Sequence, residues 1–227
     1  MPMNVATPRQ GSNRWWILSG LAIIVVALAA VFFTVPHDVA SIKRPFRSFS
    51  FPSTSMEPTL RLGEYAFADM RAYVDAPPAR GDIVVFTLPR DPATTYVKRV
   101  VGLPGERVQM KNGIVYINDE AVPTADAGTY KLAAQGEPEK PGRLKRETLP
   151  NGVSYTILDL TDNSFLDNTP VYPVPKGQYF MLGDNRDNSS DSRVLNQVGY
   201  IPRANVIGQI GMIFWSPDLS RIGTMPK

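Results

Sequence analysis

One stretch of this 227-residue chain, from Trp15 to Val35, contains no charged residue. As a helix it would be about 31 Å long, close to the thickness of a bilayer's hydrocarbon core. A buried soluble helix of this length would normally keep a polar face. A cleaved signal peptide has a shorter apolar stretch that ends in small residues, whereas this one ends in large residues before Pro36. We therefore expect an uncleaved transmembrane anchor, with Trp15 and Trp16 at one membrane interface.

The charges beside this anchor do not decide its orientation, because basic residues lie at comparable distances on both sides of it. Residues 1–14 are polar and contain Pro and Gly without apolar periodicity, which predicts a short disordered tail. Residues 36–48 are interpreted as a juxtamembrane linker.

Beyond residue 48, short apolar runs separated by turn signals predict a β-rich domain. The Asn112-Gly113 pair is the strongest two-residue hairpin signal, and Asn118-Asp119 is interpreted as a second turn. The sequence shows no long amphipathic helix after the anchor, so we expect a mainly β fold. The segments predicted to be strands are Gly81–Leu88, Thr95–Leu103, Glu106–Met110, Ile114–Asn118, Val153–Leu160, Gln178–Asp184 and Val206–Trp215.

The β-rich part is expected to consist of a main domain with an insertion. Residues 49–122 and 176–220 are assigned to the main β domain, and residues 123–175 to an inserted second lobe. The insertion begins with a stretch up to Gly152 that is rich in Pro, Gly and charge, which is typical of either a loop-rich segment or a small lobe. Residues 221–227 are interpreted as a C-terminal tail.

Two scarce residue types restrict the chemistry of the chain. It has no cysteine, which excludes thiol catalysis, thiolate metal sites and disulfides. It has one histidine, His37, so a histidine metal cluster is excluded and any Ser–His–Asp triad would have to use that residue. A net charge of +3 is too small to suggest a nucleic-acid surface. Any catalysis therefore falls to Ser, Thr, Lys or carboxylates.

Two segments could supply such groups. Ser53 and Ser55 lie between Pro52 and Pro58 in a constrained loop, which suits a nucleophile that must be held in attack geometry. Taken alone, however, this motif is better explained as an ordinary Ser/Pro turn. Lys98 lies in an apolar strand, where burial would lower its pKa towards neutrality and make it a general base.

Alternation along that strand places Lys98 with Tyr96 and Val100 on one face and Arg99 on the other. The pattern is compatible with a buried Lys98, with a buried Arg99, and with a solvated edge strand that exposes both.

A third segment, Gly183–Arg193, is a dense polar loop directly after an apolar strand. Such loops usually hydrogen-bond their own backbone. Its spacing does not match a calcium-binding EF-hand loop, so we expect no metal. We expect the loop to brace a site, with Asp191 and Arg193 as a pair and a serine directed towards the base.

Together these segments resemble the signal peptidase I family, membrane-bound Ser–Lys proteases that remove signal peptides from exported proteins. Each motif is short, but four occur in the family's order behind an anchor. The resemblance extends from Phe49 to Trp215 and is carried by Ser53–Leu60, Gly81–Phe86, Tyr96–Gly105 and Gly183–Arg193.

The resemblance implies specific roles. Ser55, the serine directly before Met56, would be the nucleophile, and neutral Lys98 the general base. The Ser55 backbone N–H and the Ser53 hydroxyl would form the oxyanion hole. The supporting residues would be Ser189, Asp191 and Arg193.

Family substrates carry small residues, usually Ala, at the first and third positions before the cut. Two residues depart from the family pattern: Phe51 stands where a smaller aliphatic is common, and Thr54 stands where Gly is common. The two shallow substrate pockets would be lined by Phe51, Pro52, Met56, Leu60, Tyr96 and Val97.

The resemblance also implies an antiparallel two-sheet catalytic domain with a variable second β lobe, and no cofactor or metal. Its partners would be signal peptides of exported preproteins, the lipid bilayer and the protein export machinery, without nucleic acid. The chain would be a single-pass protein of the bacterial cytoplasmic (inner) membrane, with its catalytic domain on the extracytoplasmic face.

Three alternatives were weighed against this interpretation. The self-cleaving transcriptional repressors also use a Ser–Lys pair, but they are soluble and begin with a helix-turn-helix, which this sequence does not show. A catalytically inactive membrane-anchored β domain that binds exported chains, and a dedicated peptidase of one secretion or conjugation system, both remain open.

Overall fold

The computed structural model describes residues 45–132 and 138–227. The described residues belong to one compact unit, Arg44–Lys227. None of their helices is long and apolar enough to cross a membrane. The predicted anchor from Trp15 to Val35, the tail before it and residues 36–44 of the linker lie outside the described residues, so they stay predictions. The last three linker residues, 46–48, belong to β1.

Antiparallel β-strands form almost all of the regular structure, which confirms the prediction of a mainly β fold. The elements are β1 (Phe46–Ser50), β2 (Tyr65–Asp69), β3 (Ile83–Leu88), β4 (Asp91–Gly102), β5 (Arg107–Lys111), β6 (Ile114–Ile117), β7 (Glu120–Ala121), β8 (Thr124–Leu132), β9 (Lys140–Thr148), β10 (Ser154–Asp159), β11 (Tyr172–Pro173), β12 (Gln178–Leu182), β13 (Ile201–Pro202), η2 (Arg203–Asn205), β14 (Val206–Trp215) and η3 (Leu219–Arg221).

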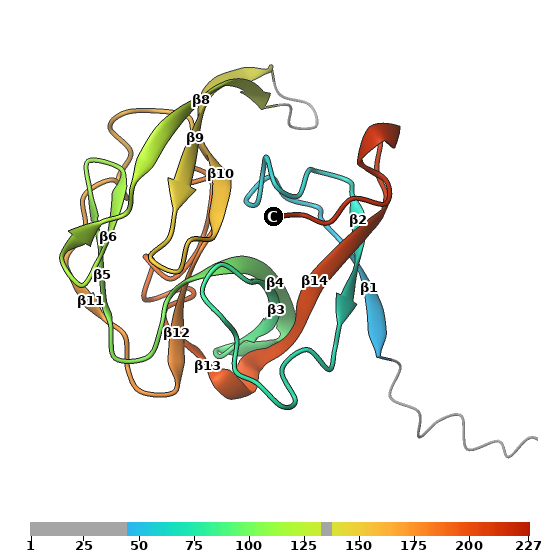
Figure 1. The fold of residues 1–227 in the computed structure, drawn as a ribbon, viewed down its shortest axis with the longest axis horizontal. Coiled ribbons are helices and arrows are strands. Elements are labelled where there is room, and N and C mark those ends of the chain that lie inside the picture. The colour runs from blue at the N-terminus through green and yellow to red at the C-terminus, as the bar shows by residue number, and fades with distance from the viewer. Residues whose placement is uncertain (1–44, 133–137) are drawn as a thin grey trace, which may run out of the picture. The chain divides into compact units, whose positions relative to one another are not determined.

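The strands form three sheets. The largest has seven strands in the order β1-β2-β14-β3-β4-β12-β13, the second has the order β11-β5-β6-β7, and the third has the order β10-β9-β8. In Figure 1, β3 and β4 lie between the β5, β6 and β11 strands on one side and β1, β2 and β14 on the other. Strands β3 and β4, which carry two of the four motifs, are therefore neighbours inside the largest sheet.

The central strand β3 is apolar along nearly its whole length because both of its faces are covered. Val84 and Phe86 pack into one buried cluster, whereas Ile83 and Val85 pack into another on the opposite face. A strand with two buried faces has no polar face, so it reads as a continuous apolar run. Its neighbour β4 shares this environment, so the two basic residues of β4, Lys98 and Arg99, are both buried.

All seven predicted strands are present, with ends that differ by a few residues and with identical bounds for Val206–Trp215. The predicted hairpin joins β5 to β6, with positive φ angles of 50° at Asn112 and 74° at Gly113. These angles are those of the turn type that matches the twist of a hairpin and favours Asn-Gly.

The segment between Pro123 and Gly152, which the sequence left open between a loop and a small lobe, contains strands β8 and β9. Most residues of β8 are exposed, so the strand lacks the apolar alternation that would have predicted it. The sequence patterns also did not predict β1, β2, β7, β11 or β13. Strand β11 lies within the predicted insertion but pairs with β5. The division into a main domain and an insertion stays a prediction.

Candidate active site

The two candidate serines lie in a loop between β1 and β2, here called the serine loop (residues 51–64). Its base is closed by backbone hydrogen bonds, since Phe51 N donates to Glu64 O at 3.0 Å and Gly63 N donates to Phe51 O at 2.8 Å. Its apolar side chains, including Met56 and the fully buried Leu60, anchor it in the core. The loop is therefore held from below while Ser53 and Ser55 remain accessible.

The structure brings Ser55 and Lys98 together although they are 43 positions apart in the sequence. Lys98 Nζ lies 2.8 Å from Ser55 Oγ and also donates to the carbonyl oxygen of Val97 at 3.0 Å. Ser53 Oγ lies 3.2 Å from Ser55 Oγ. A hydroxyl within hydrogen-bond distance of a buried amine is the geometry required for general-base activation of a nucleophile.

Burial lowers the pKa of Lys98 from its ordinary value of 10.5 to about 8. The side chain is only 2% exposed, and desolvation disfavours its charged form. The carboxylates of Asp191 and Asp184 oppose this effect, while the positive charge of Arg193 adds to it. Desolvation outweighs the carboxylates, so a large share of Lys98 is neutral near pH 8.

Arg99 is also buried, at 1% exposure, although it faces the other side of β4. Its Nε and Nη2 atoms bind the two carboxylate oxygens of Asp184 at 2.8 and 2.6 Å, and Nη1 donates to Gly81 O at 2.8 Å. A buried guanidinium with a bidentate carboxylate partner keeps its charge. The structure therefore buries both basic residues: desolvation lowers the pKa of Lys98, and Arg99 is paired with Asp184.

Gly183–Arg193, here called the bracing loop, lies against the serine loop. Arg193 Nε and Nη2 bind the Asp191 carboxylate, each at 2.8 Å, and Gly183 N donates to the same carboxylate at 3.1 Å. Burial alone would raise the pKa of Asp191, but the ion pair with Arg193 holds it below its ordinary value. The predicted pairing of Asp191 with Arg193 is thus present.

The two loops come close together at Gly183. A Cβ atom at this position would lie 2.2 Å from Ser189 Oγ and 2.5 Å from the Ser55 carbonyl oxygen. Real Cβ atoms do not approach other atoms so closely, so a larger residue would push Ser189 or Ser55 out of place. Glycine is therefore needed here for close approach, and its φ angle plays no part.

Ser189 is buried, and its Oγ has no hydrogen-bond partner among the described residues. The hydrogen bonds of Lys98 Nζ go to Ser55 and Val97. The expectation that Ser189 orients Lys98 accordingly stays a prediction. Burying a hydroxyl without a hydrogen-bond partner costs free energy. Ser189 Oγ can therefore accept or donate a hydrogen bond when a neighbouring group changes its own partners.

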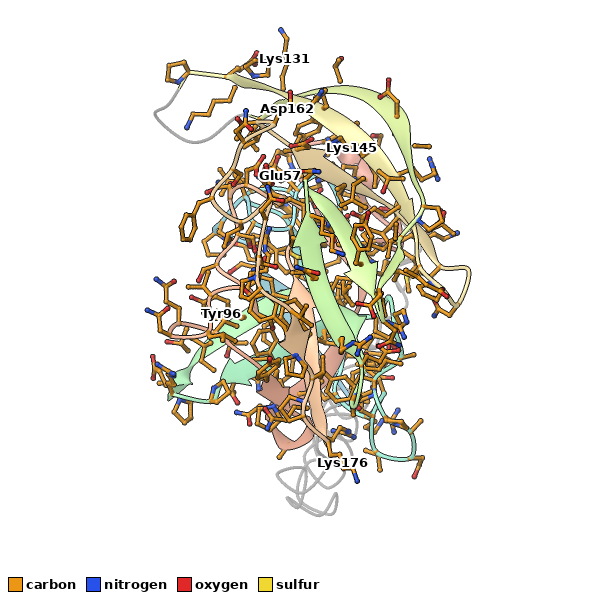
Figure 2. The ribbon with its side chains drawn as sticks, turned by 90° about the vertical axis from the view of Figure 1, so that its left-hand side faces the viewer. Glu57, Tyr96, Lys131, Lys145, Asp162 and Lys176 are labelled. Carbon is orange, nitrogen blue, oxygen red and sulfur yellow. The ribbon has the colours of Figure 1, made fainter. Side chains whose placement is uncertain are left out.

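A cavity of about 330 Å³ opens beside the Ser55–Lys98 pair. Tyr96, which projects from β4 and is labelled in Figure 2, is one of its walls. Leu60 does not line it, because this side chain packs into the core. The residues around it are Ser50, Phe51, Pro52, Ser53, Ser55, Met56, Thr95, Tyr96, Val97, Lys98, Asn188 and Ser190.

Sequence reasoning missed several of these lining residues. Ser50 lies three residues before one motif, Thr95 directly precedes another, and Asn188 and Ser190 lie inside a third. Their closeness to the motifs was the available signal. Within the ranges that the structure describes, no three His, Cys, Asp or Glu side chains gather to hold a metal ion.

Comparisons with known proteins identify the family of this chain. The model of the family described as signal peptidase, peptidase S26, matches residues 13–215. Signal peptidase I of Rickettsia typhi is 36% identical over 198 residues, which cover 76% of this chain and 73% of the relative. Signal peptidase I of Rickettsia akari is 31% identical over 240 residues, covering 94% and 83% of the two chains.

A crystal structure of a signal peptidase I from Enterococcus faecalis is also similar, with 29% identity, 58% of this chain and 95% of that chain covered, and a TM-score of 0.34. The family match and the relatives are sufficient, without this structure, to assign the chain to a family. The chain belongs to the signal peptidase family, peptidase S26, a family of serine peptidases.

Proposed function

We propose that this chain is a membrane-anchored serine endopeptidase that removes signal peptides from exported preproteins with a Ser55–Lys98 dyad. The observation that carries the proposal is the 2.8 Å contact between Lys98 Nζ and Ser55 Oγ, made by a lysine whose pKa is lowered to about 8. The family membership supports the reaction class, and the contact supports the choice of residues. It also disfavours an inactive binding domain, since such a domain has no use for a desolvated lysine beside a serine.

The proposed reaction has two halves. Neutral Lys98 takes the proton from Ser55 Oγ as that oxygen attacks the carbonyl carbon of the scissile peptide bond. The ammonium form of Lys98 then gives the proton to the leaving amine, and an acyl group remains on Ser55. Lys98, neutral again, takes a proton from the water that attacks the carbonyl carbon of this ester, and returns it to Ser55 Oγ as the bond between that oxygen and the acyl group breaks and the carboxylic acid is released.

The negative oxygen formed during each half needs hydrogen-bond donors. The Ser55 backbone N–H and the Ser53 hydroxyl are proposed for this role, because Ser53 Oγ lies 3.2 Å from the nucleophile. One such donor typically contributes about 10²- to 10³-fold to the rate. Ser189 is proposed to take over a hydrogen bond of Lys98 during turnover, and the Asp191–Arg193 pair to hold the bracing loop.

The cavity beside the dyad is proposed to bind the residues before the cut, and its volume of about 330 Å³ suits small side chains. Five residues proposed for the pockets line it: Phe51, Pro52, Met56, Tyr96 and Val97. Because Leu60 lies in the core, its proposed influence on the pockets is indirect, through packing in the same cluster as Met56.

Anchoring in the bacterial cytoplasmic membrane, with the catalytic domain outside, remains part of the proposal. Its support is the uncharged run from Trp15 to Val35 and an apolar surface within the described residues. Phe46 and Trp215 are each about half exposed on that surface. Exposed aromatic side chains of this kind favour a lipid partner, in addition to the proposed link with the export machinery.

The test is cleavage of a purified preprotein with an Ala-X-Ala site by the detergent-solubilised full chain. Wild type is compared with Ser55→Ala and Lys98→Ala, and circular dichroism verifies that all three are folded. We expect cleavage after the second Ala by wild type alone. Cleavage by either variant at the wild-type rate would refute the dyad. A folded wild type that cuts no preprotein would favour the inactive binding domain or a dedicated peptidase with another client.

A further inference from the structure

Thr54 lies between the two serines, at the position where the resemblance leads us to expect glycine. Its side chain is 7% exposed, and its Oγ1 accepts a hydrogen bond from Asn188 Nδ2 at 2.7 Å. Asn188 belongs to the bracing loop and lines the cavity. A side chain of the serine loop therefore binds directly to a wall of the substrate cavity.

The backbone of Thr54 is fixed on its other side. Its carbonyl oxygen accepts hydrogen bonds from Asn185 Nδ2 and from Glu57 N, each at 3.1 Å. This carbonyl and the Ser55 N–H belong to one planar trans peptide group, in which they point in opposite directions. Bonds that fix the carbonyl of Thr54 thus aim the N–H of Ser55, the donor proposed for the oxyanion hole.

The side-chain bond adds what the carbonyl bonds cannot supply. The peptide group can still swing about the Cα atom of Thr54 unless the residue itself is held, and a glycine would be the least restrained residue there. Thr54 is held at its carbonyl by Asn185 and at its hydroxyl by Asn188. The two bonds lie on different sides of the Cα atom, so together they restrain the residue as well as the peptide.

We propose that the Thr54 hydroxyl and the Asn188 amide form a positioning pair that holds the oxyanion-hole peptide in its productive orientation. This inference rests on the proposed function, because it assigns the pair to the same reaction. Thr54 and Asn188 act through the Ser55 N–H and transfer no proton. The pair makes use of a threonine at the point where the sequence departs from the family pattern.

The test compares Thr54→Val, which keeps the shape but cannot accept the hydrogen bond, with Thr54→Ser, which keeps the hydroxyl. Asn188→Ala and the double variant Thr54→Val/Asn188→Ala complete a double-mutant cycle. Thr224→Val is the matched control, since Thr224 is exposed near the C-terminal end and does not line the cavity. All are made in the full-length chain in detergent, and kcat, KM and the pH midpoint of kcat are measured on the Ala-X-Ala preprotein.

We expect Thr54→Val to lower kcat about tenfold, less than the about 10²- to 10³-fold for removing a donor outright, because the N–H is kept but less well aimed. KM and the pH midpoint should not change, since the cavity surface and Lys98 are untouched. Thr54→Ser should recover most of the rate. In the Asn188→Ala background, Thr54→Val should have little further effect.

Thr54→Val activity equal to wild type would overturn the inference, as would an equal loss of kcat with and without Asn188. Should Thr54→Val not fold, Asn188→Ala alone decides: this exposed residue must lower kcat for the pair to exist. These results are separate from a failure of the proposed function, which would appear as an inactive wild type or an active Ser55→Ala.

Discussion

The cleavage rate of the wild-type chain should rise with pH, with a midpoint near pH 8. Lys98 must be neutral to accept the proton of Ser55, and burial lowers its pKa to about 8. About one molecule in ten then has a neutral Lys98 at pH 7, against about one in three thousand for a lysine with the ordinary pKa of 10.5. We expect kcat/KM, which reports the ionisation of the free enzyme, to rise about tenfold between pH 7 and pH 9 and then to level off.

The measurement is kcat/KM for the preprotein at half-unit pH steps, with thermal unfolding recorded in each buffer so that loss of folded protein is not mistaken for titration. Asp191→Asn tests the electrostatic cause, because the Asp191 carboxylate favours protonated Lys98 and Arg193 opposes it. The midpoint of this variant should move to lower pH. A flat profile, or a midpoint near the ordinary value for lysine, would refute a desolvated Lys98 as the base.

Two further variants test how the site is held. Gly183→Ala should abolish cleavage, because the added carbon would lie 2.2 Å from Ser189 Oγ. Gly211→Ala is the control, since the nearest atom to an added carbon there would be 3.4 Å away. Equal cleavage rates for the two variants would contradict the close approach at Gly183. Glu147→Ala should lower the free energy of unfolding by about 3–5 kcal/mol, because it leaves the buried Arg186 guanidinium unpaired. Urea denaturation measures this loss, and a loss below about 1 kcal/mol would show that Arg186 finds another partner.

Much of the fold could be predicted from the sequence because its strands are short apolar runs between strong turn signals. The Asn112-Gly113 turn is an example, since its two positive φ angles are what that dipeptide favours. Strand β8 could not be predicted, because its exposed residues leave no alternation to detect. Its partner β9 also lacks a regular apolar alternation, because it is rich in basic residues. Such strands are defined by pairing, which sequence patterns do not encode.

The alternation along β4 left open which basic residue would be buried, and the structure buries both. This outcome depends on groups far away in the sequence. Arg99 can be buried because Asp184, 85 positions away, supplies a bidentate partner. Lys98 faces Ser55 and has no carboxylate in hydrogen-bond contact among the described residues, so desolvation determines its pKa. The motifs identified the chemical groups, but only the fold shows that Arg99 is paired with a carboxylate and that desolvation lowers the pKa of Lys98.

The contribution of the β8–β10 sheet to the site had no signal in the sequence. Tyr130 on β8 donates to Glu57 of the serine loop at 2.9 Å. Figure 2 shows Glu57 in the same part of the molecule as Lys131 and Lys145 of β8 and β9.

On β9, Glu147 binds Arg186 of the bracing loop through two hydrogen bonds of 2.7 and 2.6 Å. One small sheet therefore contacts both loops that meet at Ser55. Because the two loops must keep a fixed distance for proton transfer, a change in this sheet can alter catalysis without touching a catalytic residue. The β8–β10 sheet, whose strand β8 has no predictive sequence pattern, therefore supports both loops of the candidate site.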